Sequence, residues 1–307
     1  MDYAKQYPED EKPSVWYIDQ TIRNEKLQTR KPKQKKKKGG AEYLLYPVQC
    51  IKNLKGVHQS ADFIGKKYIA GRTEPINIFS TSYYTPFKLY QIARVLAEKS
   101  VYALNELYNQ WCVYPIPDVF RMDNGLQFRG TGSGKRCIGT FLRFLLNLQV
   151  TPLFGSPSKP WTNPYVEGHN RVFNEKVWGQ NFFTNVEQID QECKRFNEES
   201  LEFFHFTYAQ MIVNGTYRYL EKNQKIKTEK LETHKGKKIY FIRFVESHEN
   251  TNSAYITILN EDIALPEKYN HQFVFVEWDI EKDHMLIYSE YKKSISLIHQ
   301  LKFRLNL

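Results

Sequence analysis

Cysteine is scarce in this sequence: the 307 residues contain only Cys50, Cys112, Cys137 and Cys193. The four lie far apart, with no Cys-x-x-Cys pair and no Cys/His spacing suited to structural zinc. This argues against a disulfide framework and against a zinc-ribbon protein. The thiols are predicted to be free and reduced, as in a cytoplasmic protein.

Long hydrophobic runs are missing as well. No apolar stretch approaches the roughly 20 residues that a membrane-spanning helix needs. The polar start MDYAKQYPEDEKP is unlike a signal peptide. We therefore expect a protein without membrane attachment that is located in the cytoplasm.

What the sequence has instead is a globular composition and a concentrated positive charge. Hydrophobic residues make up 41% and aromatic residues 15%, and the length predicts about two structured modules. The formal net charge is +10, and the run Arg30–Lys38 has seven basic groups and no acidic one. Within it, Lys35, Lys36, Lys37 and Lys38 favour contact with a phosphate backbone, although a solvated linker explains a lysine run equally well.

Three regions follow one another along the chain. Residues 1–40 contain one predicted amphipathic helix, Ser14–Leu27, followed by the basic linker RKPKQKKKKGG. Residues 41–222 are predicted to form an α/β domain with a mixed sheet, which starts as an antiparallel meander of three strands. Residues 223–307 are predicted to form a small all-β barrel, because KIYFIRFV, AYITIL, FVFVEWD and HMLIYS are short β-rich runs separated by turns.

The elements of the α/β domain can be placed from their periodicity and from the turn residues between them. The predicted strands are Ala61–Ala70, Pro75–Tyr84, Leu89–Leu96, Asp118–Met122 and Val150–Phe154. The predicted helices are Ser100–Trp111, which Ser100 could cap, Ile138–Leu148 and Tyr165–Trp178; residues 185–222 are expected to be mostly helical.

Two acidic residues stand at the ends of these elements. Asp123 ends a predicted strand, and Glu167 lies on the helix that follows the Pro- and Ser-rich loop Ser156–Pro164. Taken singly, Asp-Asn-Gly is good turn chemistry and Glu167 is an ordinary helix-surface residue. Together, acids contributed by separate elements are what a metal site requires.

Three motifs around these acids resemble a known family. They are HQSADFIG at His58–Gly65, PxxxRMDNGLQF at Pro117–Phe128 and SPSKPWTNPYVEGHNRVFNEKVW at Ser156–Trp178. In this order they resemble the catalytic core of the DDE transposases and retroviral integrases, in particular bacterial insertion-sequence transposases. The C-terminal runs resemble the small β-barrel that follows this core, and QTIRNEKLQTRKP resembles the end of the helix-turn-helix that precedes it.

The resemblance implies a ribonuclease H-like fold and an enzyme that cleaves and joins DNA strands. It names Asp62 as a third acid, and it implies that Asp62, Asp123 and Glu167 hold two Mg²⁺ (or Mn²⁺) ions, with Asp62 bridging both. Asp19 in WYIDQT is a competing candidate for the first acid. We reject it, because it precedes the lysine-rich linker whereas Asp62 opens the strand meander.

Residues near the acids are candidates for contact with DNA. Arg171 and Asn174 lie four and seven residues past Glu167, and are therefore predicted to share its helical face, although an ordinary polar face explains them equally well. Lys159, Trp161 and Asn163 lie in the preceding loop, where a scaffold can position them against backbone or base.

The sequence departs from the family pattern in three ways. Pro164 stands where the family usually has glycine, which fixes one backbone angle. Asp123 and Glu167 are separated by 43 residues, more than is usual, and the extra ones are predicted to lie in the Gly-rich surface loop RGTGSGKRC. The N-terminal segment resembles only a remnant of a helix-turn-helix, as in a shortened transposase.

The predicted function is therefore a DNA transposase or integrase, acting as a homo-oligomer on element ends and target DNA in the bacterial cytoplasm and at the nucleoid when bound. A catalytically silent remnant that binds DNA or full-length relatives is the first alternative. A ribonuclease H-like nuclease acting on RNA:DNA hybrids is the second, and it would need neither the barrel nor the basic arm.

Overall fold

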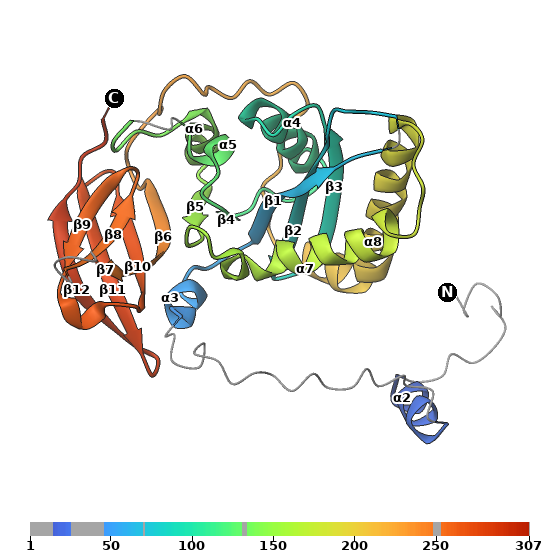
Figure 1. The fold of residues 1–307 in the computed structure, drawn as a ribbon, viewed down its shortest axis with the longest axis horizontal. Helices are drawn as coiled ribbons and strands as arrows, with labels where there is room; N and C mark the ends of the chain where they lie inside the picture. Colours follow the sequence, from blue (N-terminus) through green and yellow to red (C-terminus); the bar gives the residue numbers. More distant parts are fainter. Residues whose placement is uncertain (1–14, 26–45, 70, 131–133, 248–252, 307) are drawn as a thin grey trace. The chain divides into compact units, whose positions relative to one another are not determined.

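The computed structural model describes residues 15–25, 46–69, 71–130, 134–247 and 253–306 of the chain (Figure 1). The chain divides into two units, residues 1–43 and 44–307. In the first unit, the predicted helix is confirmed as α2 (Val15–Asn24), and Asp19 lies on it. Lys35, Lys36, Lys37 and Lys38 lie outside the described residues.

The second unit is a mixed α/β fold around a nine-stranded sheet, with strand order β12-β11-β10-β6-β5-β4-β1-β2-β3. The predicted meander is confirmed: β1 (His58–Lys67), β2 (Ile76–Thr85) and β3 (Leu89–Val95) pair antiparallel. On the other side of β1, β4 (Val119–Met122) and then β5 (Thr151–Phe154) pair in parallel. This sheet carries the site described below.

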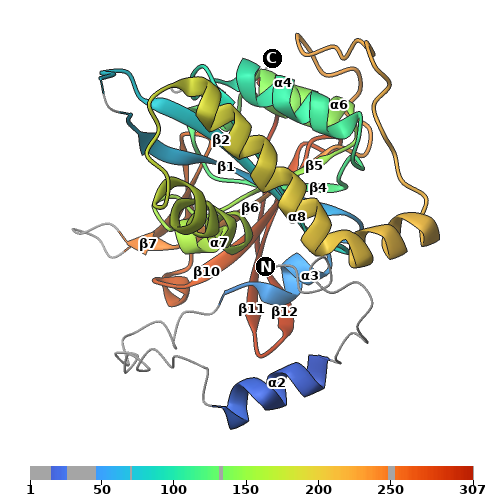
Figure 2. The same cartoon turned by 90° about the vertical axis from the view of Figure 1, so that its right-hand side faces the viewer.

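Helices cover both faces of the meander and of β4 and β5 (Figure 2). On one face, the short α5 (Leu126–Arg129) packs with α4 (Ser100–Trp111) and α6 (Thr140–Asn147), against Ala61, Phe63 and Phe120 of the strands. On the other face lie α7 (Pro164–Phe173), the π-helix η3 (Asn174–Trp178) and α8 (Val186–Asn214), which pack on Ile64, Ile78 and Ile92. Because side chains alternate along a strand, Asp62 lies on the face that carries α7.

Two local predictions need correction. Ser100 does not cap its helix: Lys99 is the N-cap, and the Ser100 hydroxyl donates instead to the Gln127 carbonyl oxygen, at 2.5 Å. The helix predicted over Tyr165–Trp178 is α-helical only to Phe173 and then widens into η3. Pro164 occupies the first turn of α7, where the missing N–H costs nothing and the fixed φ suits the helix.

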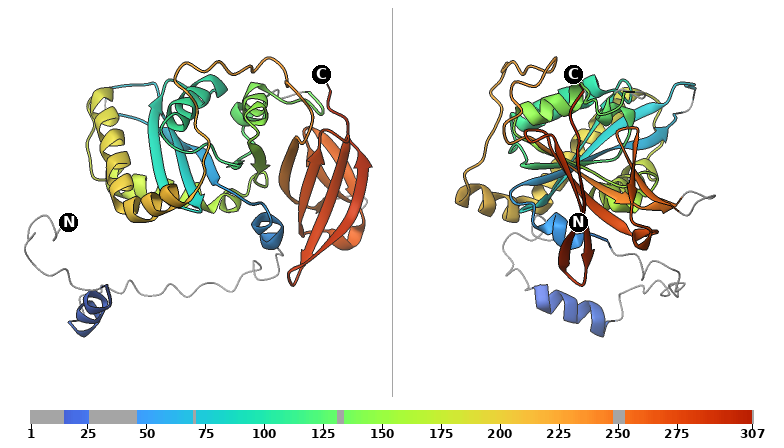
Figure 3. Two further views of the ribbon diagram at one scale, coloured as in Figure 1. Left: turned by 180° about the vertical axis from the view of Figure 1, so that it is seen from behind. Right: turned by 90° about the vertical axis from the view of Figure 1, so that its left-hand side faces the viewer.

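The C-terminal strands extend the sheet, because β6 (Lys238–Phe244) pairs in parallel with β5 through Leu153–Tyr240 and Phe154–Phe241 (Figure 3). The sheet then continues through β10 (Phe273–Asp279), β11 (His284–Tyr291) and β12 (Ser294–Lys302). A separate all-β barrel is thus not confirmed. The remaining strands form a small sheet packed on this region: β7 (Glu246–Ser247), β8 (Ala254–Ile258) and β9 (Glu261–Leu265).

Short helices complete the unit. α3 (Val48–Lys52) precedes β1, and Glu290 of β11 accepts hydrogen bonds from the backbone N–H groups of Gln49 and Cys50, at 2.7 and 3.0 Å. The 3₁₀ turns are η2 (Pro160–Thr162) and η4 (Glu267–Tyr269). Among the described residues, no helix combines the length and the apolar character needed to cross a membrane.

The loop predicted from RGTGSGKRC is docked on the C-terminal strands in its described part. The Arg136 guanidinium forms an ion pair with Glu261 of β9, with Nε to Oε2 at 2.6 Å. The same guanidinium lies 4.7 Å from the ring centroid of Phe303. The Asn306 backbone N–H donates to the Arg136 carbonyl oxygen at 3.0 Å. The described part of this loop therefore connects the α/β region to the C-terminal strands.

Candidate functional site

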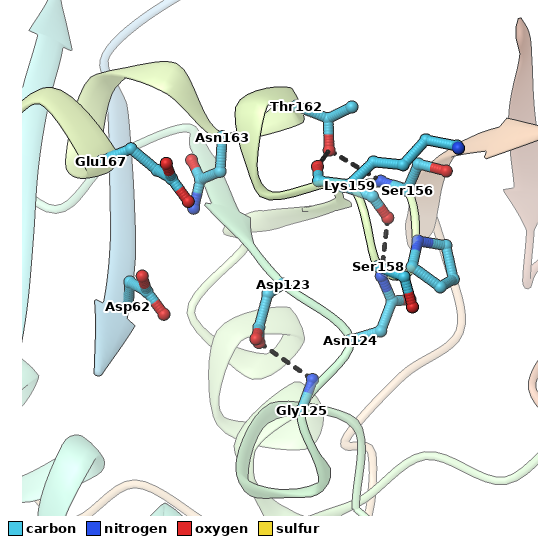
Figure 4. Close-up of a pocket in the computed structure, with 12 residues that line it drawn as sticks. Asp62, Asp123, Asn124, Gly125, Ser156, Ser158, Lys159, Thr162, Asn163 and Glu167 are labelled. Carbon is cyan, nitrogen blue, oxygen red and sulfur yellow. Dashed lines mark hydrogen bonds between the residues drawn. The ribbon is translucent and has the colours of Figure 1, made fainter. Parts of the chain in front are cut away.

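The three acids predicted from the sequence line one pocket of about 330 Å³ (Figure 4). Asp62 comes from β1, Asp123 follows the last residue of β4, and Glu167 lies in the first turn of α7. The pocket wall continues through Asn124 to Gly125 and through the segment Gly155–Lys159. Residues that are far apart in the sequence are thus brought to one place by the sheet and by α7.

Sheet register explains why Asp62 and Asp123 meet. β1 and β4 pair in parallel with Ser60 beside Arg121. Continuing this register by two residues sets Asp62 beside Asp123, and neighbouring strands lie only about 4.8 Å apart. Asp62 therefore stands where β4 ends and its chain turns away, which leaves room for a pocket.

Backbone and amide donors orient two of the carboxylates. Asp62 accepts hydrogen bonds from its neighbour's amide, Phe63 N–H, at 2.8 Å and from the Asn170 side chain of α7 at 3.2 Å. Asp123 accepts one from Gly125 N–H at 2.9 Å, an Asx turn that aims the carboxylate back into the pocket. Asn170 was not predicted from the sequence, although its spacing of three residues from Glu167 places both on one side of α7.

The electrostatics of the pocket disfavour three ionised carboxylates. Burial raises the pKa of Asp62 to about 7, with further contributions from the nearby charges of Asp123 and Glu167. Burial also raises the pKa values of Asp123 and Glu167. The main forces that act on all three groups therefore oppose their negative charge, and a bound cation would reverse this.

Two observations test whether these residues suit metal ions. The donors are carboxylate oxygens, which hard divalent cations prefer. Burial destabilises their ionised form, and a bound cation would stabilise it. Among the residues that the structure describes, however, no three His, Cys, Asp or Glu side chains are close enough together to hold one ion. The chemistry of the donors suits a hard cation, but their placement does not assemble a group of ligands around one.

The loop residues predicted to contact DNA divide into two groups. Lys159 and Asn163 line the pocket, and the Asn163 amide donates to the Ala61 carbonyl oxygen of β1 at 3.3 Å. The Lys159 ammonium lies 4.2 Å from the ring centroid of Phe244. Trp161 is outside the pocket and 47% exposed, with its ring 5.2 Å from that of Phe273.

The residues predicted on the face of Glu167 are not gathered with it. Arg171 is exposed and does not line the pocket. Asn174 is the first residue of the π-helix η3 and does not line the pocket either. Neither is brought to the acids in this structure. His169, two residues past Glu167, is buried, and its Nδ1 lies 2.9 Å from the Ser80 hydroxyl of β2.

Comparison with known proteins gives little beyond a distant likeness. No protein-family model and no curated protein matches the sequence. Among solved structures, the chain is similar to a chain in the cryo-EM structure of a simian T-cell lymphotropic virus intasome in complex with PP2A regulatory subunit B56 gamma. The match has 12% sequence identity and a TM-score of 0.38, and covers 78% of this chain and 75% of that one. A likeness this distant does not define a class of protein.

Proposed function

We propose that this protein is a divalent-cation-dependent polynucleotidyl transferase that cleaves and joins DNA strands, with the chemistry of a transposase or integrase. The observation that carries the proposal is that Asp62, Asp123 and Glu167, each singled out by its own motif, line one pocket. Three unrelated acids would have no reason to converge there.

The arrangement of the fold supports the same proposal. The order of three antiparallel strands, a helix, a parallel strand, a helix, a second parallel strand and a helix is the one expected for a ribonuclease H-like core. In this proposal residues 46–222 supply that core. The C-terminal strands supply its continuation rather than a separate barrel.

The residues of the pocket would bind the metal ions and contact the DNA. Asp62, with Asp123 on one side and Glu167 on the other, would hold two Mg²⁺ or Mn²⁺ ions. Such ions activate the attacking oxygen and neutralise the leaving one in an in-line displacement. Lys159 would contact a phosphate, because this basic residue lines the same pocket as the three acids. Water and then a DNA 3′-OH would be the two nucleophiles.

The direct test is a nicking and strand-joining assay on labelled duplex DNA with Mg²⁺ or Mn²⁺, comparing the unmodified protein with Asp123→Asn. The flanking DNA of the gene supplies the substrate ends. Asp190→Asn is a matched control, because this exposed carboxylate lies on α8 and pairs with Arg94 of β3, outside the pocket lining. We expect metal-dependent products from the unmodified protein and from Asp190→Asn, and a loss of at least about a hundredfold in Asp123→Asn.

The same assay separates the alternatives. An RNA:DNA hybrid as a further substrate tests for a ribonuclease H-like nuclease, which would prefer it. DNA binding without turnover in either metal would indicate a silent remnant. Cleavage by Asp123→Asn at the rate of the unmodified protein would contradict the proposed function.

A further inference from the structure

A buried arginine of β6 lies behind the pocket. In the run KIYFIRFV, every second residue from Ile239 faces the interior, which places Arg243 in series with Ile239, Phe241 and Val245 on an apolar face. It is 4% exposed. Burial lowers its pKa to about 9, so the guanidinium remains charged at neutral pH.

The contacts of Arg243 join three elements. Its Nη2 donates to the Asn124 side-chain oxygen at 2.8 Å, and its Nη1 donates to the Gly155 carbonyl oxygen at 2.9 Å. Its Nε donates to the Thr257 carbonyl oxygen of β8 at 2.9 Å. All of these acceptors are neutral oxygens, so the charge is held by geometry rather than by a carboxylate.

Two of these acceptors, Asn124 and Gly155, belong to the pocket wall. Asn124 follows Asp123 directly, and Gly155 follows β5 and begins the loop that leads to Lys159. They are also bonded to each other, because the Asn124 amide donates to the Gly155 carbonyl oxygen at 2.7 Å. The two Nη groups of Arg243, which form a rigid fork, therefore bind Asn124 and Gly155 while these two residues bind each other. The three hydrogen bonds fix the ends of β4 and β5 relative to one another.

Stability alone does not explain a charge at this position. Burying a guanidinium costs several kcal/mol of desolvation, and the acceptors of Arg243 named above are neutral oxygens rather than a carboxylate that would offset the charge. A methionine in series with Ile239, Phe241 and Val245 would complete the apolar face. A residue that is costly for folding and that bridges two segments of a pocket wall points to a role in the pocket.

We propose that Arg243 is a positioning residue that aligns Asp123 and the Gly155–Lys159 segment, so that the C-terminal strands form part of the reactive site. The expected effect of Arg243 on DNA cleavage rests on the proposed function. The structural content of the inference, that one guanidinium holds both segments, can be measured without any turnover.

The test compares Arg243→Met and Arg243→Lys with the unmodified protein, by hydrogen exchange and by Mg²⁺-dependent cleavage. Lys238→Met is the control, because Lys238 lies on the same strand but pairs with Glu277 on β10. We expect the amides of residues 123–126 and 155–159 to exchange at least about tenfold faster in Arg243→Met. Arg243→Lys keeps the charge but loses the fork, so it should behave in the same way.

Cleavage by both Arg243 variants is expected to fall about tenfold to a hundredfold, since displacements of about 1 Å have that effect. Lys238→Met should change neither readout at the site. If Arg243→Met unfolds, Arg243→Lys and Asn124→Ala carry the test. Unchanged exchange in both segments overturns the proposal whatever the cleavage shows, and so does full cleavage by Arg243→Lys in an active protein. An inactive unmodified protein with faster exchange in the variants contradicts only the proposed function.

Discussion

At the scale of single residues, the acids could be predicted because each lies inside a motif whose spacing is local. Asp123 needed only a strand followed by Asn-Gly, and Glu167 needed only a helix after a Pro-rich loop. Arg171 and Asn174 are placed by helical spacing from Glu167, and α7 runs unbroken through Arg171, but a shared helical face does not decide which side chains line a pocket. Asn124 and Arg243 depend on contacts across 119 positions of sequence, which no local pattern contains.

Substitution of Asp62 should reveal the free-energy cost of its ionised carboxylate in the pocket. The folded-state pKa of Asp62 is about 7, above its usual value, so the folded protein binds more protons than the unfolded chain between about pH 4 and 7. Stability of the metal-free protein from this group is therefore present at low pH and lost as pH rises through 7. We expect Asp62→Asn to raise the melting temperature at pH 7.5 and to have little effect at pH 4.5.

Thermal unfolding in EDTA at the two pH values measures this difference. An asparagine can keep the acceptor for Phe63 N–H, and its amide can donate to the Asn170 oxygen once that side chain turns over. The gain at pH 7.5 is expected to be about 1–3 kcal/mol. A variant that is less stable than the unmodified protein at pH 7.5 would show that the ionised Asp62 carboxylate does not destabilise the fold.

At the scale of elements, the pattern of apolar residues predicted most strands and helices but not their long-range pairing. The four runs predicted as strands in the C-terminal region all fall on strands, namely β6, β8, β10 and β11. That β6 would pair with β5 could not be predicted, because pairing between distant strands depends on surfaces that form only in the folded chain. The one visible signal was Arg243 interrupting an apolar series in KIYFIRFV.

The inserted loop gives a test of how the two regions are joined. Arg136 and Glu261 form a partly exposed ion pair, so Arg136→Glu and Glu261→Arg are each expected to lower stability by about 1 kcal/mol. The double exchange should restore much of it, because the pair is re-formed with reversed charges. Urea unfolding of the four proteins measures the coupling, and strictly additive losses would show that the loop is not held by this pair.

At the scale of the whole molecule, the concentrated positive charge and the acidic pocket fall in different parts of the chain. The formal net charge is +10, and seven of the basic groups fall between Arg30 and Lys38, outside the unit that carries the pocket. The pocket itself is acidic. In the proposed function, the basic segment would bind the DNA backbone and the acidic pocket would bind the cations.

Neutralising the basic segment should weaken DNA binding in a salt-dependent way. Changing Lys35, Lys36, Lys37 and Lys38 to glutamine is expected to reduce the slope of log affinity against log salt by about 3–4, because each phosphate contact contributes about 0.9 on duplex DNA. The matched control changes four other lysines, between residues 222 and 230: Lys222, Lys225, Lys227 and Lys230. Fluorescence anisotropy at several salt concentrations measures both, and equal slopes in the two variants would show that the basic segment has no special part.

The central claim is that Asp62, Asp123 and Glu167 form one site whose negative charge calls for divalent cations. Titration of the protein with Mn²⁺ at pH 7.5, followed by the electron paramagnetic resonance signal of the free ion, tests it without any substrate. We expect the unmodified protein to bind Mn²⁺ and to release protons as it does so, because Asp62 is partly protonated beforehand. Asp62→Asn should lose this binding. Equal Mn²⁺ binding by the unmodified protein and by Asp62→Asn would contradict it.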